Sequence, residues 1–200
     1  MRLTTLLLAL LLPASVSGLQ AQTEYYARLG AVGANNLVRD VIVDEVTVRQ
    51  SIAPMIALGA SLPIATRGYR VGLEGTLSSG KFHSRENGSD TDLGTLRTAT
   101  LLLNLEGPIH RDFRWRAGLG GIQYWPADKR GIFLSGGSLR FLAGAGVDYR
   151  RPVLPRWDLM TSLRYDFHRF TTDELDSRGF SQTQSVSRVS LSVGLSRSAR

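Results

Sequence analysis

The chain has 200 residues, of which 42% are hydrophobic and 20% charged, with 24 lysines and arginines against 17 acidic residues and no cysteine. This length allows one ordinary domain, and the missing cysteine excludes disulfides, thiolate metal sites and cysteine nucleophiles. The basic excess is a weak indication of contact with phosphate-bearing lipid headgroups. Because no basic patch with interleaved aromatics is present, we expect no nucleic-acid partner.

The first 21 residues differ from the rest. Arg2 precedes an almost wholly apolar run over residues 3–12, and small residues follow. A positive start, an apolar run of about ten residues and a small-residue end describe a secretory signal peptide, because a spanning helix needs about 20 apolar residues. We predict a signal peptide over residues 1–21 and one exported barrel domain over residues 22–200. Alternative cleavage points are Ser17 and Gly18.

Segments of about ten residues, in which apolar and polar side chains alternate, follow one another through the mature chain. Because successive strand residues point to opposite faces, each segment has one apolar face and one face of charge, hydroxyl and glycine. Pro54 lies in the second segment and cannot donate to a sheet ladder, so we expect a bulge or a late membrane entry there. We predict eight strands, over residues 24–33, 49–62, 69–79, 95–106, 113–125, 139–150, 157–168 and 185–195.

The connections between these strands alternate in length. The first long one carries alternating valines that predict a projecting hairpin around Asp44 and Glu45. Outer-membrane barrels have short periplasmic turns and long outer loops, so the alternation predicts that the first strand begins at the periplasmic end. The long connections cover residues 34–50, 80–93, 126–137 and 171–184, and the short turns cover residues 63–67, the Gly107-Pro108 pair and residues 151–156.

Alternation alone does not show whether the apolar faces point into a protein core or toward lipid. A soluble antiparallel sheet buries its apolar face in a core, whereas a membrane barrel turns it to lipid. Repeated strands of about 9–11 residues with aromatics at their ends favour the membrane barrel. The predicted fold is all-β, an eight-stranded antiparallel up-and-down transmembrane β-barrel. Its two aromatic girdles are predicted as Tyr25, Tyr69, Phe113, Trp115, Tyr149 and Trp157 near the periplasmic rim, and Trp125, Phe141, Tyr165 and Phe167 near the outer rim.

The inward faces of the predicted barrel carry many charges. Charges removed from water need partners, so we expect arginine–carboxylate networks across the lumen. Eight strands enclose a space that side chains roughly fill, which argues against a broad water-filled pore. The predicted lumen charge network consists of Arg28, Arg70, Glu74, Glu106, Arg114, Arg116, Arg140, Asp148, Arg164, Asp166 and Arg188.

Taken together, the leader, the eight alternating strands, the girdles and the charged interior resemble the small outer-membrane β-barrel proteins of Gram-negative bacteria, of the OmpA, OmpX and OmpW type. Residues 118–124 (GLGGIQY) and 191–195 (LSVGL) are similar to strand segments of such barrels. The resemblance implies an outer-membrane location, contact with lipid and lipopolysaccharide, and insertion by the barrel assembly machinery. The usual cue for that machinery is a terminal aromatic, whereas residues 195–200 read LSRSAR. We expect a monomer.

Three functions remain open at this point. The first is a structural or surface-interaction role, and the second is an enzyme that modifies lipid A at the outer leaflet. Resemblance to the lipid A deacylase would require His-x-Ser, but His83 is followed directly by Ser84, and Phe170 stands where His168 would need a serine. The third is a soluble, lipocalin-like binding barrel. We predict no catalytic residue, no metal site and no cofactor.

Overall fold

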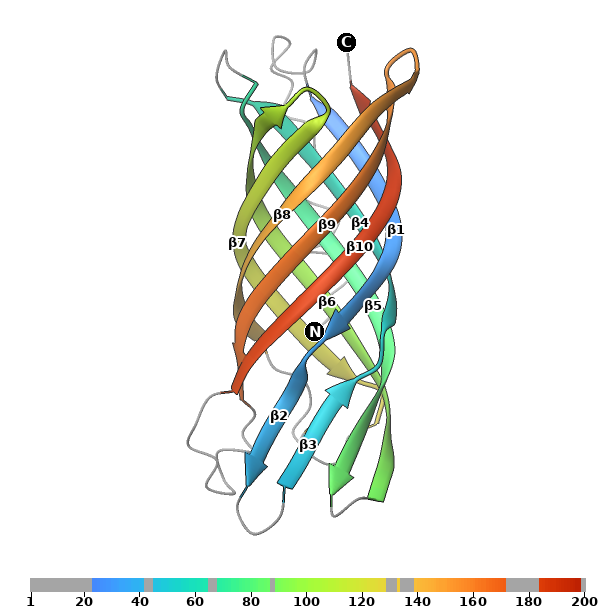
Figure 1. Ribbon diagram of the computed structural model, residues 1–200, viewed down its shortest axis with the longest axis vertical. Helices are drawn as coiled ribbons and strands as arrows, with labels where there is room; N and C mark the ends of the chain where they lie inside the picture. The colour runs from blue at the N-terminus through green and yellow to red at the C-terminus, as the bar shows by residue number, and fades with distance from the viewer. Residues whose placement is uncertain are drawn as a thin grey trace, which may run out of the picture.

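The computed structural model describes residues 23–41, 45–64, 68–86, 89–128, 133, 139–171 and 184–198. These residues form one antiparallel sheet of ten strands (Figure 1). The predicted signal peptide lies outside the described residues. No helix of the described part is long and apolar enough to cross a membrane. The strands are β1 Glu24–Ala34, β2 Asn36–Val41, β3 Glu45–Gln50, β4 Ala53–Pro63, β5 Arg70–Glu86, β6 Ser89–His110, β7 Phe113–Pro126, β8 Leu139–Leu154, β9 Trp157–Phe170 and β10 Gln184–Ser198.

Eight of the described strands close a ring. Their order is β1, β4, β5, β6, β7, β8, β9 and β10, and β10 returns to pair with β1 from Arg188 opposite Ala34 to Ser198 opposite Glu24. The strands run obliquely to the long axis of the ring (Figure 1). Closure satisfies the backbone groups that an open edge would leave unpaired in hydrocarbon. The predicted eight-stranded antiparallel barrel is confirmed.

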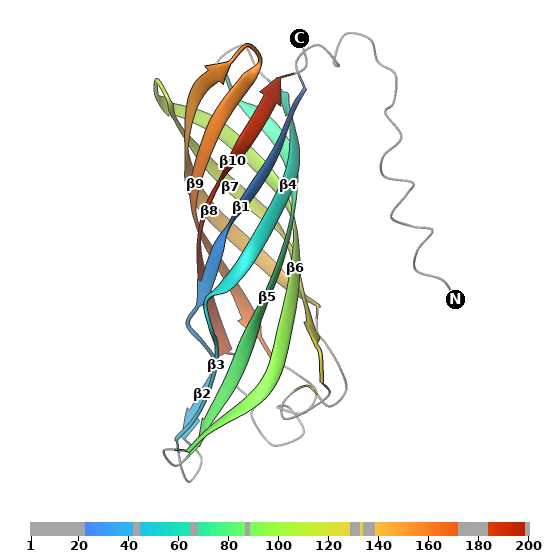
Figure 2. The same cartoon turned by 90° about the vertical axis from the view of Figure 1, so that its right-hand side faces the viewer.

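The strands β2 and β3 extend β1 and β4 beyond one end of the ring. β2 pairs with β3, and β3 pairs with β5 from Gln50 opposite Phe82 to Val46 opposite Glu86. The predicted projecting hairpin is therefore present, although its expected tip at Asp44 lies outside the described residues. Figure 2 shows these strands and the ends of β5 and β6 projecting together. We call β2, β3 and residues 81–86 and 89–95 the blade. Following the predicted orientation, we name the end of the barrel that carries the blade the outer end and the opposite end the periplasmic end.

Three predicted connections were wrong in extent. Residues 80–93 are not a loop, because β5 and β6 stay paired as far as Glu86 opposite Ser89. β6 continues through Gly107-Pro108 to His110, with a register shift after Pro108, and β8 continues to Leu154. The reason is that backbone pairing depends little on hydropathy, so a ladder can continue into water after the apolar alternation stops. The connections over residues 126–137 and 171–184 lie mostly outside the described residues.

Strand pairing is interrupted near Pro54, as expected of a residue without an N–H group, although the interruption does not fall on the proline itself. It sits near the start of β4, opposite Ala31 of β1, while the pairing of β4 with β5 begins only at Met55. The break between β3 and β4 falls at Ser51 and Ile52, where the Ser51 amide donates to the Lys81 carbonyl at 2.9 Å. The ladder is therefore interrupted just before the proline.

The outer surface of the barrel is apolar, and many of the inward side chains are polar or charged. On β10 the side chains of Val189, Leu191, Val193 and Leu195 are 45–59% exposed, whereas Arg188 is 3% exposed. The other seven strands of the ring show the same alternation, with leucines outward on β6 and Thr98, Asn104 and Glu106 inward. Water would penalise such a continuous exposed apolar surface, and lipid would not. The soluble, lipocalin-like alternative therefore does not fit the structure.

Candidate functional site

The lumen contains a group of buried ion pairs centred on Arg116 and Glu74. Arg116 forms ion pairs with Glu74, with Asp148 at 2.6 Å and with Glu106 at 3.4 Å. Glu74 also pairs with Arg28, and with Arg164 at 3.2 Å. These side chains come from different strands around the ring, so the group cross-links the barrel wall through its interior. Buried charges keep their ionised form only with this kind of pairing.

Tyr26 of β1 completes this group. Its hydroxyl donates to Glu74 Oε2 at 2.9 Å and accepts from Arg116 Nη1 at 3.2 Å. The guanidinium carbons of Arg28 and Arg116 lie 5.3 and 5.0 Å from the centre of its ring. The ring thus offers its face to two cations while its hydroxyl satisfies a carboxylate.

A second set of ion pairs lies nearer the periplasmic end, close to the start of β1. Arg150 pairs with Glu24, and with Glu106 at 2.9 Å. Arg70 lies 3.6 Å from Glu24, and Arg114 lies 3.9 Å from Glu106. Both sets meet at Glu106, which also pairs with Arg116. We call the two sets together the lumen network.

Most of the predicted lumen charges therefore lie inside the barrel and in contact, but two do not meet a carboxylate there. Arg140 is half-buried and donates to the Thr171 carbonyl at 2.6 Å. Arg188 donates to the hydroxyls of Thr98 at 3.1 Å and Ser78 at 3.3 Å. Asp166, which faces Arg188 across the β9–β10 ladder, bonds to Arg164 at 2.6 Å instead.

Sequence reasoning missed three members of the network, namely Glu24, Tyr26 and Arg150. All three had a usable signal, because they have the same strand parity as residues that were predicted to point inward. Glu24 and Tyr26 share the face of Arg28, and Arg150 shares that of Asp148. Glu24 and Arg150 are the end residues of predicted strands, and Tyr26 lies two residues before Arg28, which was chosen for its charge. The parity of such residues is easy to overlook.

The outer half of the lumen is apolar, which sequence reasoning did not predict. Tyr124 and Phe170 rings lie 5.2 Å apart, and Phe133 packs against Phe82 at 5.7 Å. Tyr124 also bonds through its hydroxyl to His168 Nε2 at 2.6 Å. We call this set the outer apolar cluster. Its members are Leu37, Val48, Phe82, Leu96, Leu102, Ile122, Tyr124, Phe133, Leu142, Phe170 and Val186, all buried.

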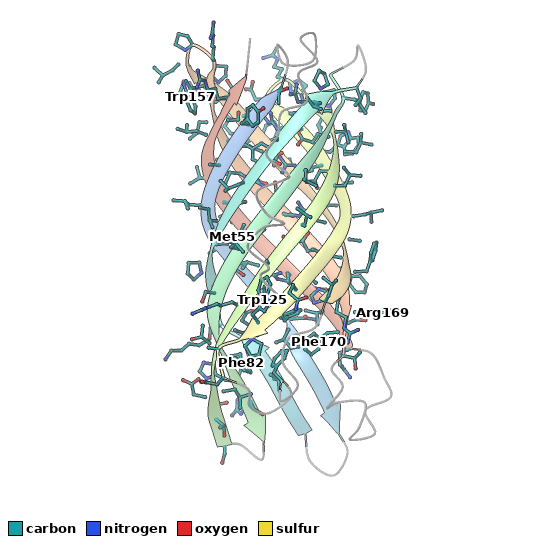
Figure 3. The ribbon with its side chains drawn as sticks, turned by 180° about the vertical axis from the view of Figure 1, so that it is seen from behind. Met55, Phe82, Trp125, Trp157, Arg169 and Phe170 are labelled. Atoms are coloured by element: carbon teal, nitrogen blue, oxygen red, sulfur yellow. The ribbon has the colours of Figure 1, made fainter. Side chains whose placement is uncertain are left out.

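The residues predicted for the aromatic girdles are outward-facing and half-buried or exposed. At one end the rings of Phe113 and Tyr149 lie 5.2 Å apart and those of Tyr69 and Trp115 lie 6.2 Å apart. Figure 3 shows Trp157 at that end and Trp125 toward the outer end. Phe141, Tyr165, Phe167, Tyr25 and Trp125 are 40–67% exposed.

Basic side chains accompany the aromatics at the outer end. Arg97 lies directly opposite Trp125 in the β6–β7 ladder and is exposed. Arg169 is exposed too, and Figure 3 shows it near the level of Trp125. Farther out on the blade, the amide of Gly94 donates to Asp92 at 2.8 Å, which lowers the pKa of that carboxyl. We call Arg97 and Arg169 the outer basic pair.

The histidines are not arranged around a nucleophile in the part of the chain that the structure describes. His83 faces Asp92 across the β5–β6 ladder, while Ser84 points to the opposite side of the strand. His168 is buried against Tyr124, and His110 is exposed at the end of β6. Among the described residues no group of His, Asp and Glu is suited to a metal ion.

The comparisons with known proteins rest on structure. No protein-family model and no curated protein matches the sequence. The outer membrane protein OprG from Pseudomonas aeruginosa matches with a TM-score of 0.50 and 13% identity, over 90% of this chain and 98% of that chain. AlkL, an outer membrane protein solved in DMPC lipid bilayers, matches with a TM-score of 0.56 and 14% identity, over 94% of each chain. At these identities the likeness shows the fold.

The outer surface of the barrel indicates the environment in which the protein folds. A closed antiparallel ring with an outward apolar band is the architecture of bacterial outer-membrane barrels, because strands can cross hydrocarbon only when every edge is paired. The chain is therefore a small eight-stranded transmembrane β-barrel with the fold of bacterial outer-membrane proteins.

Proposed function

We propose that the protein is a closed barrel with a structural or surface-interaction role in the outer membrane, and neither a pore nor an enzyme. The observation that carries the proposal is the filling of the lumen at two levels. The lumen network links Glu74, Arg116 and Asp148 across the periplasmic half. The outer apolar cluster then occupies the outer half with side chains such as Phe82, Tyr124 and Phe170, which are fully buried.

A closed lumen makes a direct prediction about conductance. A solute would have to break buried ion pairs and then separate packed aromatic rings, and both steps are costly. Purified protein in a planar lipid bilayer should therefore produce no stable conductance steps in potassium chloride. Reproducible steps from the wild-type protein would contradict the proposal. Insertion is checked separately by protease protection of the same protein in vesicles.

The interaction role rests on the blade and the outer basic pair. The blade extends the barrel beyond the apolar band with exposed charged residues, among them Arg85, Asp90 and Asp92. Arg97 lies opposite Trp125, and Arg169 lies at a similar level on another side of the barrel (Figure 3). This depth suits the phosphates of lipopolysaccharide, since girdle aromatics sit at headgroup level. We therefore propose lipopolysaccharide as the lipid partner at this rim, and insertion by the barrel assembly machinery.

Charge removal at the outer rim tests the lipid contact. The double variant Arg97→Gln and Arg169→Gln should bind lipopolysaccharide about thirtyfold more weakly, since each surface charge contributes about 1 kcal/mol near an anionic surface. The matched control is Arg151→Gln with Arg197→Gln, two exposed arginines near the periplasmic end. Equal affinity of both double variants for lipopolysaccharide in mixed micelles would remove the proposed contact.

The lipid A-modifying alternative has its own test. Deleting the gene should leave the acylation pattern of lipid A unchanged in mass spectra of the isolated lipid. A changed pattern that is restored by the wild-type protein would establish the enzyme and overturn the structural role.

A further inference from the structure

A small enclosed cavity lies inside the barrel where the lumen network gives way to apolar side chains. Glu74 and Arg164 line it on the network side, and Met55 and Val32 line it with apolar surface. Figure 3 shows Met55 between Trp157 and Phe82 along the barrel. The cavity has a volume of about 10 Å³. That space suits one water molecule or one small ion, and it excludes phosphate or any larger solute.

Arg188 lines this cavity with an incomplete set of partners. The residue is 3% exposed, and its Nη2 donates to the hydroxyls of Thr98 and Ser78. Its Nε and Nη1 are buried and have no hydrogen-bond partner in the part of the chain that the structure describes. Arg164, which also lines the cavity, has a buried Nη2 without a partner. Two guanidiniums on neighbouring strands thus line the same small space, and each has a buried N–H group without a partner among the described residues.

Among the described residues no carboxylate forms an ion pair with Arg188, although Glu74 and Asp166 line the same cavity. Glu74 is shared by Arg28, Arg116 and Arg164. Asp166 faces Arg188 in the ladder, but its Oδ1 bonds to Arg164. The other buried carboxylates, Glu24, Glu106 and Asp148, pair with Arg150 or Arg116 nearer the periplasmic end. Three guanidiniums, of Arg28, Arg164 and Arg188, therefore line the cavity with two carboxylates, of Glu74 and Asp166. One buried positive charge in the lining has no carboxylate to match it, and a buried charge calls for a counter-charge.

We propose that the cavity binds one chloride-class anion, held by Arg188 together with hydroxyl donors that line the same space. Ser190 and Ser192 lie on the inward face of β10, two and four residues after Arg188, and Thr76 adds a third hydroxyl. Guanidinium N–H and hydroxyl groups donate hydrogen bonds to an anion. A water molecule could fill the space but would leave the charge of Arg188 uncompensated.

The anion is a resident of the structure and does not pass through it. Met55 and Val32 belong to a buried apolar cluster on one side of the cavity, and the lumen network closes the other. The inference therefore goes beyond the proposed function, and a closed barrel does not by itself require it.

Thermal unfolding in different anions tests the site. The protein is refolded in detergent micelles with sodium chloride, sodium bromide or sodium methanesulfonate at equal ionic strength. Methanesulfonate is too large for the cavity, so chloride and bromide should raise the unfolding midpoint by about 3 °C or more relative to it, in a saturable manner. Arg188→Gln should remove this anion dependence, and Arg151→Gln, at an exposed arginine outside the lumen, should keep it.

Bromide diffraction supplies a measurement that needs no variant. Crystals of the wild-type protein grown in bromide should show anomalous density beside Arg188. If Arg188→Gln fails to fold, the Ser190→Ala and Ser192→Ala double variant replaces it and should weaken the anion dependence. Equal midpoints in all three salts, or bromide density only on the outer surface, would overturn the proposal and assign the cavity to water.

Discussion

The two halves of the lumen fill the same kind of space by opposite means. In the periplasmic half, guanidiniums and carboxylates link strands through ion pairs, as between Arg116 and Asp148. In the outer half, rings such as Tyr124 and Phe170 pack as in the core of a soluble protein. This difference shows that the inward face of a membrane barrel need not be polar along its whole length. The apolar outer face is required by lipid, whereas the inner face needs only complete packing or complete pairing.

The largest expected effect is the loss of Glu74. In Glu74→Gln, the arginines Arg28, Arg116 and Arg164 lose a shared buried anion, so we expect the free energy of unfolding to fall by about 3–5 kcal/mol. Urea titration of the protein in lipid vesicles measures it. A loss below about 1 kcal/mol would mean that water or a neighbouring carboxylate replaces Glu74, and the periplasmic half would not be a tightly paired region.

The corresponding cut in the outer half is Leu102→Ala. Leu102 is 1% exposed inside the outer apolar cluster. Its truncation should lower the free energy of unfolding by about 2–4 kcal/mol, because contacts are lost and a cavity remains. The control is Leu103→Ala on the neighbouring outward position, which is 60% exposed and should cost less. Equal losses for the two variants would contradict the packing of the outer half.

A single hydroxyl can be removed from each half for a matched comparison. Tyr26→Phe deletes a hydroxyl that bonds to both Glu74 and Arg116, so we expect a loss of about 1.5–3 kcal/mol. Urea unfolding in vesicles again gives the value. A loss under about 0.5 kcal/mol would indicate that the ion pairs close without the tyrosine.

The matched substitution in the outer half, Tyr124→Phe, should have the smallest effect on the free energy of unfolding. It deletes one bond, to His168, and leaves the ring contacts with Phe133 and Phe170 in place. We expect a loss of about 0.5–1.5 kcal/mol. If Tyr124→Phe lowers the free energy of unfolding by more than Tyr26→Phe does, hydrogen bonding contributes more to the stability of the outer half than its apolar composition indicates.

One glycine shows how closely the polar half is fitted. A Cβ atom at Gly144 would lie 2.0 Å from Asp166 Oδ1 and 2.7 Å from Arg164 Nη2. Glycine at this position therefore leaves room for the Arg164–Asp166 ion pair on the neighbouring strand. Gly144 is therefore a position where the close approach of an ion pair requires glycine.

Much of the fold was predictable because it depends on a period of two. Val189, Leu191 and Val193 could be assigned to one face of β10 from spacing alone, and Arg188 to the other. The continuation of β5 to Glu86 and of β6 to His110 was not predictable in this way. In those parts of the strands the pairing of the backbone continues without the alternation that lipid imposes.

The candidate site was predictable only in part. Parity placed Glu74, Arg116 and Arg188 on inward faces, but parity does not say at which height two strands meet. That height depends on the stagger of the closed ring, and it pairs Glu74 with three arginines while leaving Arg188 to hydroxyls. The apolar outer half was missed for the same reason, since its residues come from six strands of the ring, from β2 and β3, and from Phe133 in the connection after β7.

The sequence by itself determined which side chains face lipid, because alternation along a strand is local and the membrane penalises an error in it at about 2–4 kcal/mol per arginine near the midplane. Only the tertiary structure decided which inward residues meet. Contacts across a barrel join residues far apart in the chain, such as Arg150 and Glu24, and their choice follows from the register of every ladder in the ring.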